Sequence, residues 1–159
     1  MFCVFFFCQA EDGIRDLVRS RWLGDVYKRQ PEHNPLYEDM PVMDYLSFSA
    51  SLQGVAESDL NTRVVEMVRL CGLDVEKHKK IGELSKGYRQ RVGLAQAIIH
   101  NPKILILDEP TTGLDQNQIV EIRELIRKLG REKTVILSTH ILPEVETTCD
   151  RILIKNKGK

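Results

Sequence analysis

The chain has 159 residues, of which 42% are hydrophobic and 29% are charged. This composition supports a globular core and excludes a wholly disordered chain. The 23 Lys and Arg residues balance the 23 Asp and Glu residues, so the net charge argues against a broad nucleic-acid-binding face. The four cysteines form no Cys-x-x-Cys pair, and no histidine lies at zinc-site spacing from them. The apolar run at residues 1–8 is far shorter than the roughly 20 residues that cross a bilayer.

Residues 1–30 differ in character from the rest of the chain. They show no sustained helical or strand periodicity, whereas ordered elements with clear stops begin at Pro31. The segment from about Ala10 to Gln30 resembles translated sequencing-adapter sequence. We therefore expect residues 1–30 to be a non-native artefact or a disordered extension, with a real but divergent extension as the alternative. We exclude them from the fold prediction.

Three helices are predicted next along the chain. Apolar residues recur at helical spacing in residues 41–54 and again in residues 60–72, and each run ends at a glycine. A third helix is predicted over about residues 86–100. Pro102 would close it, because the residue before a proline is disfavoured in the α conformation.

The last third of the chain alternates between strands and helices. Continuous apolar runs at residues 104–107, 134–138 and 151–155 are typical of strands buried on both faces of a parallel sheet. A helix is predicted over residues 119–129, and a short one after Pro143. Strands that alternate with helices in this way predict right-handed parallel crossovers and therefore an α/β core.

Two adjacent carboxylates follow the first of these strands. Asp108 and Glu109 stand where the strand emerges at its carboxyl end, the edge at which open α/β sheets bind ligands. One carboxylate can hold Mg²⁺ through its water shell, and its neighbour can position or deprotonate an attacking water. Taken alone, the pair is equally consistent with an acidic turn after a strand.

A second candidate site lies at the start of the third helix, in the run Leu84-Ser-Lys-Gly-Tyr-Arg-Gln-Arg91. Ser85 is a suitable N-cap residue. Gly87 permits close approach of the backbone, so that amide N–H groups and the helix dipole could receive a phosphate. An ordinary capped helix is the alternative interpretation.

Two single residues complete the set of candidates. His140 follows the buried strand at residues 134–138 and is expected at the same sheet edge as the carboxylates, within reach of a phosphate. A capping or packing role is the alternative for this histidine. Asp115, taken alone, would be only the N-cap of the next helix.

The order and spacing of these motifs resemble those of ABC ATPase nucleotide-binding domains. Residues 84–90 resemble the signature motif, in the variant L-S-K-G-Y where L-S-G-G-Q is commoner. Residues 104–110 are similar to the Walker B motif with its following glutamate. Residues 112–115 match the D-loop, and His140 matches the H-loop.

The resemblance extends over residues 31–159. Residues 31–37 resemble the segment after the Q-loop strand, with Glu32 where most members carry glutamine. The Walker A loop, Gly-x-x-x-x-Gly-Lys-Ser/Thr, is not found in the chain. We therefore expect a truncated P-loop NTPase core, with a Q-loop region and helical signature subdomain at 31–100 and a Walker B, D-loop and H-loop half at 101–159.

The resemblance implies a head-to-tail pair of domains that encloses two ATP molecules. Asp108 would hold Mg²⁺, Glu109 would activate water, and His140 would contact the γ-phosphate. Glu32 would still offer oxygen to Mg²⁺, but it adds a negative charge near the phosphates. The residues expected to contact ATP, in part across the interface, are Glu32, Ser85, Lys86, Gly87, Tyr88 and Asp115.

The resemblance favours the energising subunit of a bacterial exporter of the drug, polysaccharide or gliding-motility kind. Its partners would be a second ABC ATPase domain and a transmembrane permease, which would hold it at the cytoplasmic face of the membrane. We expect no nucleic-acid partner, and no ATP hydrolysis by this polypeptide alone. A soluble ABC ATPase that acts on ribosomes or DNA and a non-catalytic regulatory module are the alternatives. The side chains that could line a groove for the permease are Met40, Val42, Met43 and Tyr45, although each of them, taken singly, fits a core position better.

Overall fold

The structure is a computed structural model, and it describes residues 3–6, 27–30, 36–139, 141 and 147–151. Its contacts divide the chain into two compact units. The sheet unit consists of residues 1–32, 102–112 and 126–159. The helical unit consists of residues 33–101 and 113–125.

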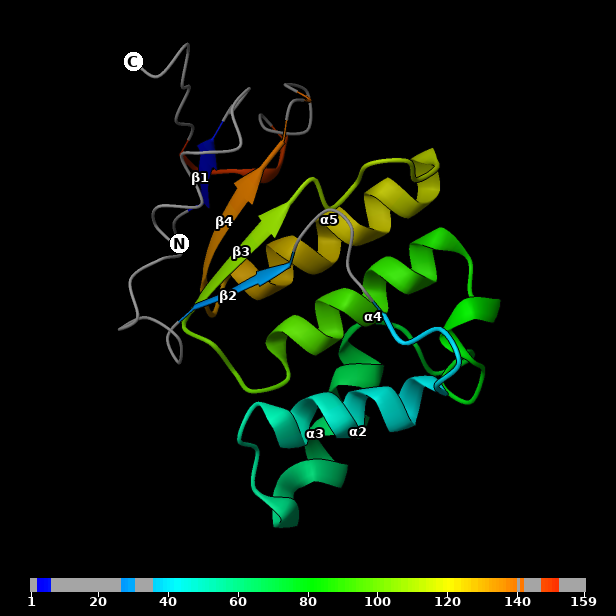
Figure 1. The fold of residues 1–159 in the computed structure, drawn as a ribbon. Helices are drawn as coiled ribbons and strands as arrows, with labels where there is room; N and C mark the ends of the chain where they lie inside the picture. The colour runs from blue at the N-terminus through cyan, green and yellow to red at the C-terminus, as the bar shows by residue number, and fades with distance from the viewer. Residues whose placement is uncertain (1–2, 7–26, 31–35, 140, 142–146, 152–159) are drawn as a thin grey trace. The chain divides into compact units, whose positions relative to one another are not determined.

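The sheet unit contains one parallel sheet of four strands. The strands are β1 (Cys3–Phe6), β2 (Tyr27–Gln30), β3 (Ile104–Asp108) and β4 (Thr134–Ser138). They lie side by side in the order β1-β4-β3-β2, and each neighbouring pair is parallel (Figure 1). The predicted α/β class with parallel strands is confirmed.

The two central strands build the core of this sheet. Leu105, Ile106 and Leu107 are buried on β3, as expected for a strand that is covered on both faces. In the register between the strands, Asp108 on β3 lies opposite Ser138 on β4. The carboxyl ends of β3 and β4 therefore meet at one edge of the sheet.

The strands β1 and β2 lie in the segment that the sequence analysis set aside, so the expectation that residues 1–30 hold no regular element is wrong at these eight positions. The reason is that their pairing is not local: Cys3 lies opposite Val135 in the register. The strand β1 lies within the apolar run at residues 1–8, which was excluded together with the rest of residues 1–30, whereas β2 contains no apolar run. Whether residues 1–30 belong to the natural protein stays a prediction.

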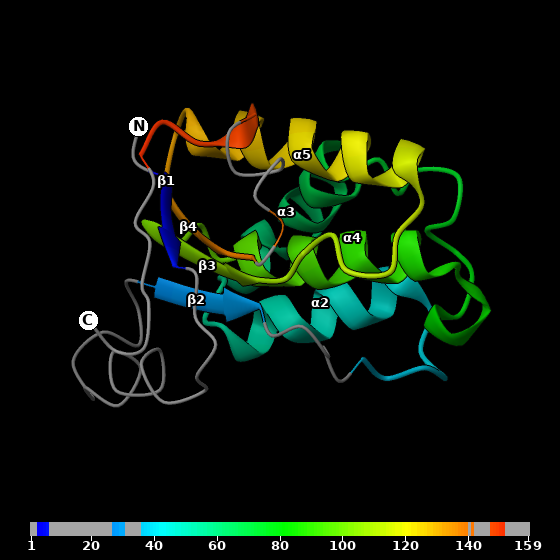
Figure 2. The same ribbon diagram turned by 90° about the horizontal axis from the view of Figure 1, so that it is seen from above.

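The helical unit contains α2 (Val42–Leu52), α3 (Glu57–Leu70), the 3-10 helix η1 (Ile81–Glu83) and α4 (Lys86–Ile98). Helices α2, α3 and α4 contact one another, as Figures 1 and 2 show. The helix α5 (Gln116–Gly130) begins in the helical unit, and the division between the units falls within it. The predicted helices are therefore confirmed, with small shifts at their ends.

Glycines end two of the helices as predicted. Gly54 after α2 has φ 79° and Gly72 after α3 has φ 65°, a left-handed conformation that glycine adopts without steric cost. Helix α4 ends at Ile98, slightly earlier than predicted, and Asn101 before Pro102 has φ 60°. Asn101, the residue directly before the proline, has thus left the right-handed α conformation.

Two of the four residues considered for a permease groove lie in the core. Val42 is fully buried and Tyr45 is 4% exposed, because both lie on the side of α2 that packs against the other helices. Burial raises the pKa of the Tyr45 hydroxyl, since a buried phenolate would lose its hydration. Met40 and Met43 are half-buried. The core interpretation is confirmed at Val42 and Tyr45.

The third predicted strand, at residues 151–155, and the short helix after Pro143 lie largely outside the described residues. Within the part of the chain that the structure describes, no helix combines the length and the apolar character needed to cross a bilayer.

Candidate functional site

The two carboxylates after β3 lie at the carboxyl edge of the sheet. Asp108 is the last residue of the strand, and Glu109 is the first residue beyond it. The backbone N–H of Glu109 donates to the carbonyl of Ser138 at 2.9 Å, which fixes the start of the turn to the end of β4. Both carboxylates are half-buried, so they can meet a ligand and still be held in place.

The backbone changes direction at Glu109. Its φ of 47° lies in the left-handed region, which a residue with a Cβ atom rarely adopts. Such a conformation costs on the order of 1–3 kcal/mol, and it persists where surrounding contacts enforce it. The turn after β3 therefore begins at Glu109.

Two hydroxyl groups hold the Glu109 carboxylate. The hydroxyl of Thr112 donates to Oε2 of Glu109 at 3.1 Å, and the hydroxyl of Thr139 donates to the same atom at 3.4 Å. Thr139 is 2% exposed and also accepts a hydrogen bond from the N–H of Ile141 at 3.2 Å. These contacts fix the position of the carboxylate through one of its two oxygens.

The donor set at this edge fits a magnesium ion that is held mainly by water and phosphate oxygens. Mg²⁺ needs one or two protein carboxylates and keeps several waters. Asp108 supplies such a carboxylate, with the hydroxyl-bearing Ser138 opposite it in the register. Among the described residues, no group of three or more His, Cys, Asp or Glu side chains could hold a metal by itself.

The signature motif forms the start of α4 in the helical unit. Ser85 is the N-cap residue, and its side-chain oxygen accepts from the N–H of Tyr88 at 3.4 Å. Lys86 is exposed at the first helical position, and Gly87 is buried. The Tyr88 ring lies 5.8 Å from the guanidinium carbon of Arg91. The predicted cap is confirmed, and the motif is a helix start with a buried glycine in its first turn.

Asp115 begins α5 in the same unit. Its Oδ1 accepts from the N–H of Gln118 at 2.9 Å, the geometry of a helix N-cap. Gly113, two residues earlier, has φ 71° and allows the turn that leads into the helix. The capping role of Asp115 is therefore confirmed, and its role at a nucleotide stays a prediction.

The predicted site residues are divided between the two units. Asp108 and Glu109 belong to the sheet unit, whereas the signature residues 85–88 and Asp115 belong to the helical unit. His140 and Glu32 lie outside the described residues, so their predicted roles stay predictions.

Sequence reasoning missed the residues that hold the candidate groups. Thr112 and Thr139 were not singled out, although each lies within a motif quoted for a neighbouring residue. Arg91 and Gln118 were also missed, because their partners lie about thirty residues away in the sequence. The only signal for Thr112 and Thr139 in the sequence was a hydroxyl group close to a proposed catalytic residue. This signal is weak, because the sequence does not show which group the hydroxyl contacts.

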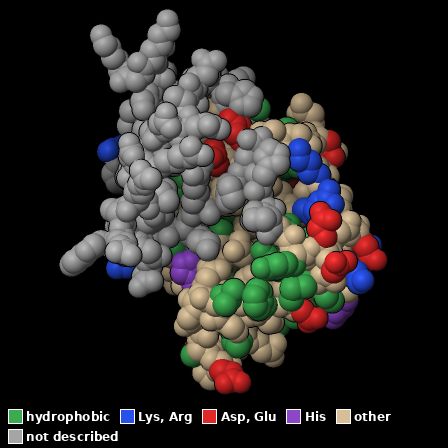
Figure 3. Space-filling view, in the orientation of Figure 1, with side chains coloured by type: hydrophobic (Ala, Val, Ile, Leu, Met, Phe, Trp, Pro, Cys, Tyr) green, Lys and Arg blue, Asp and Glu red, His purple; other side chains and the backbone are tan. Residues whose placement is uncertain are grey.

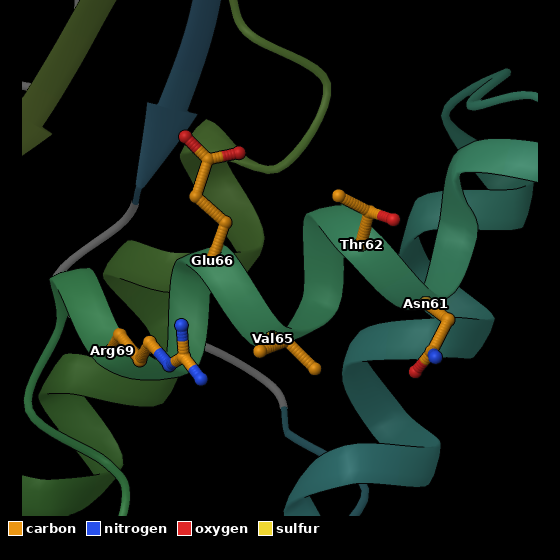
Figure 4. A pocket seen from close by; sticks show the side chains of 5 residues that line it. All are labelled: Asn61, Thr62, Val65, Glu66 and Arg69. Carbon is orange, nitrogen blue, oxygen red and sulfur yellow. The ribbon is translucent and has the colours of Figure 1, made fainter.

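A cavity of about 450 Å³ lies elsewhere on the surface of the helical unit (Figure 4). All of its lining residues come from α3, and none belongs to a motif described above. They are Asn61, Thr62, Val65, Glu66 and Arg69. The Glu66 carboxylate there pairs with Arg63 at 2.6 Å. A hollow formed by one helix does not bring together groups from different segments, so the motifs remain the candidate site.

Comparison with known proteins agrees with the motifs. The sequence model of the ABC transporter family matches residues 22–112. The chain is 37% identical over 129 residues to the uncharacterized ABC transporter ATP-binding protein YxlF of Bacillus subtilis. This match covers 81% of this chain and 44% of YxlF. The chain is 39% identical over 125 residues to the bacitracin transport ATP-binding protein BcrA of Bacillus licheniformis, covering 77% of this chain and 40% of that protein. It thus spans less than half the length of these two relatives.

A solved structure with the same fold supports the assignment. The chain superposes on cbiO1 from Clostridium perfringens, part of the ABC transporter complex cbiONQ, with a TM-score of 0.82 and 25% identity. The superposition covers 99% of this chain and 74% of that one. The family match covers more than half of the chain and includes both the signature turn and the paired carboxylates. Because motifs, fold and family match agree, the chain belongs to the ABC transporter family, as part of its ATP-binding domain.

Proposed function

We propose that the intact protein hydrolyses ATP to energise an ABC membrane exporter, and that this chain carries its Walker B carboxylates and its signature turn. The observation that carries the proposal is the Glu109 carboxylate, which Thr112 and Thr139 hold at the carboxyl edge of the sheet. The transport role of BcrA, given by its name, supports a role in membrane transport.

The two carboxylates would divide the chemistry between them. Asp108 would hold Mg²⁺ through its water shell, and the ion, when bound, would neutralise charge on the phosphate oxygens. Glu109 would orient a water for in-line attack on the γ-phosphate and accept a proton from it. The hydrogen bonds from Thr112 and Thr139 would hold the carboxylate in place while it orients that water.

The signature turn would act on the nucleotide of a second ATPase domain. Ser85 and the backbone around Gly87 form a helix N-terminus, where N–H groups and the helix dipole favour a phosphate. In a head-to-tail pair, this turn closes the site only when ATP bridges the interface. Binding would therefore favour the dimer, and hydrolysis would release it.

A permease partner would dock on an exposed aromatic surface of the helical unit, which we define as Tyr37, Phe48 and Leu52. Their exposed fractions are 59%, 41% and 72%. The Tyr37 ring meets the rings of Phe48 and Tyr45 edge to face, with centroids 5.9 and 6.1 Å apart. Figure 3 shows hydrophobic side chains gathered over α2 on this face. Aromatic side chains exposed in such a group are typical of protein interfaces.

The test of the proposed ATPase function is the Glu109→Gln variant of the intact protein. Glutamine has nearly the same shape as glutamate but cannot accept the proton, so we expect turnover to fall by a factor of about 10²–10⁴. ATP should still drive dimerisation, because the amide leaves the binding groups unchanged. Phosphate release measures turnover, and sedimentation with and without Mg-ATP measures dimerisation.

The matched control is Glu132→Gln, the same substitution at an exposed glutamate after α5. It should hydrolyse ATP at the wild-type rate. Near-normal hydrolysis by Glu109→Gln would refute the role of Glu109. An intact wild-type protein without ATPase activity would refute the proposed function as a whole.

A further inference from the structure

Two contacts cross between the signature turn and the segment that begins α5. A Cβ atom at Gly87 would lie 2.7 Å from Cδ of Gln118 and 2.9 Å from its Oε1. A Cβ atom at Gly113 would overlap with the Lys86 ammonium group. The Gln118 side chain therefore lies directly against Gly87, and the Lys86 side chain lies directly against Gly113. All four residues belong to the helical unit.

The Gln118 side chain starts from a fixed backbone. The N–H of Gln118 donates to Oδ1 of Asp115 at 2.9 Å, which ties it to the cap of α5. About one turn further along each helix, Arg91 on α4 pairs with Glu121 on α5. The contact of Gln118 with Gly87 is thus followed, about one turn further along, by a second link between these helices.

The second link is itself anchored to the end of α3. Nη1 of Arg91 donates to the carbonyl of Cys71 at 3.1 Å. A Cβ atom at Gly72 would lie only 2.7 Å from the same nitrogen. The guanidinium therefore occupies a space that a side chain at position 72 would fill, so the link between α4 and α5 has little freedom to shift.

We propose that Gln118 is a positioning residue for the signature turn. Its carboxamide would make the position of the backbone at Gly87 depend on that of the segment Gly113–Asp115. The contact of Lys86 with Gly113 would likewise make the position of that segment depend on the signature turn. The two segments would then approach the shared nucleotide as one body. This inference rests on the proposed function, because it assumes that the signature turn meets a phosphate.

The contact gives a second reason for glycine at position 87. A methyl group there must displace the Gln118 carboxamide, and the turn would then lose its lateral support. If this displacement causes the loss of activity in a Gly87→Ala variant, removal of the Gln118 carboxamide should make room for the methyl group and restore activity. If Gly87 serves only the close approach of a phosphate, removal of the carboxamide cannot help.

The experiment is a double-mutant cycle in the intact protein with Gly87→Ala, Gln118→Ala and the combined variant. We expect kcat to fall about thirtyfold for Gly87→Ala and about threefold for Gln118→Ala. The combined variant should be about tenfold more active than the product of these losses allows, which corresponds to about 1.4 kcal/mol. The KM for ATP should stay within about twofold, since the signature turn acts only in the closed pair.

The control is Asn117→Ala, an exposed neighbour on α5 that should leave kcat unchanged. A readout without nucleotide tests the contact itself: the ¹⁵N–¹H amide resonance of Gly87 should shift in Gln118→Ala and not in Asn117→Ala. An unshifted resonance would overturn the inference, and so would losses of kcat that simply multiply in the combined variant.

The two proposals fail in different ways. If the wild-type protein does not hydrolyse ATP, the proposed function falls and the inference falls with it, whatever the resonance does. If the wild-type protein hydrolyses ATP and the cycle shows no coupling, only the role of Gln118 is overturned.

Discussion

At the scale of single residues, the main feature of the candidate site is the set of contacts that fixes Glu109 in position. The residue sits at φ 47°, and its N–H bonds to Ser138. The hydroxyls of Thr112 and Thr139 converge on one carboxylate oxygen from two different loops. A carboxylate fixed in this way loses less freedom when it meets a water, which is the condition for efficient general-base catalysis.

Removal of one hydroxyl should loosen this carboxylate. In the intact protein, Thr139→Val keeps the shape of the side chain but loses the hydrogen bond to Glu109 and the acceptor for the N–H of Ile141. A typical hydrogen bond contributes about 1 kcal/mol, so we expect about a fivefold loss of kcat and a free energy of unfolding lower by about 1 kcal/mol. Steady-state ATPase assays and urea unfolding measure the two effects.

The matched variant is Thr112→Val, which removes the other hydroxyl from the same oxygen. It should lower kcat to a similar extent with a smaller loss of stability, because no acceptor for Ile141 is lost. Wild-type kcat in both variants would contradict the role of the hydroxyls.

At the scale of elements, local patterns were sufficient for the two central strands and for every helix longer than one turn among the described residues. Apolar spacing located α2, α3, α4 and α5, and the glycines at 54 and 72 marked true ends. The continuous apolar runs located β3 and β4. These signals work because burial of one helix face, or of both strand faces, leaves its mark within a few residues. The strand β2 could not be predicted, since it contains no apolar run and its partner lies far along the chain. The strand β1 does lie in an apolar run, but that run was excluded together with residues 1–30.

The candidate site was predictable to the same extent. The acids, the cap serine and the cap aspartate appear in motifs, so residue types and spacing identify them. The contacts of Gln118 with Gly87 and of Arg91 with Glu121 arise only when two helices are folded together. No local pattern contains that information.

Asp115 allows the capping role to be separated from the effect of its charge. In the intact protein, Asp115→Ala should lower the free energy of unfolding by about 1 kcal/mol, because the N–H of Gln118 loses its acceptor. Asp115→Asn should retain most of this stability, since asparagine caps helices about as well. Urea unfolding measures the difference. An Asn variant as unstable as the Ala variant would contradict the capping role, and lost hydrolysis in a stable Asn variant would assign a function to the charge.

At the scale of the whole molecule, the candidate catalytic acids Asp108 and Glu109 belong to one unit and the signature turn belongs to the other. This division suits a protein whose signature turn works on the nucleotide of a partner domain. It also leaves the outer side of α2 with a surface that neither motif uses, formed by Tyr37, Phe48 and Leu52. Residues that α2 needs for its own packing, such as Leu46, are fully buried. The exposed aromatic surface is therefore additional to the core.

Phe48→Glu tests whether this surface docks a permease. A carboxylate in the centre of an apolar interface would be desolvated without a partner, and central aromatic residues commonly contribute about 2 kcal/mol or more to binding. We therefore expect the intact protein to bind its membrane subunit about thirtyfold more weakly. ATP hydrolysis by the isolated protein should stay unchanged, since Phe48 lies outside the motifs.

The control is Val75→Glu, which introduces the same charge at a residue that is 82% exposed and lies outside this surface. The Val75→Glu variant should bind the membrane subunit normally. Equal affinity of the Phe48→Glu variant and the wild-type protein, measured by co-purification and by titration in detergent, would assign the permease contact to another face.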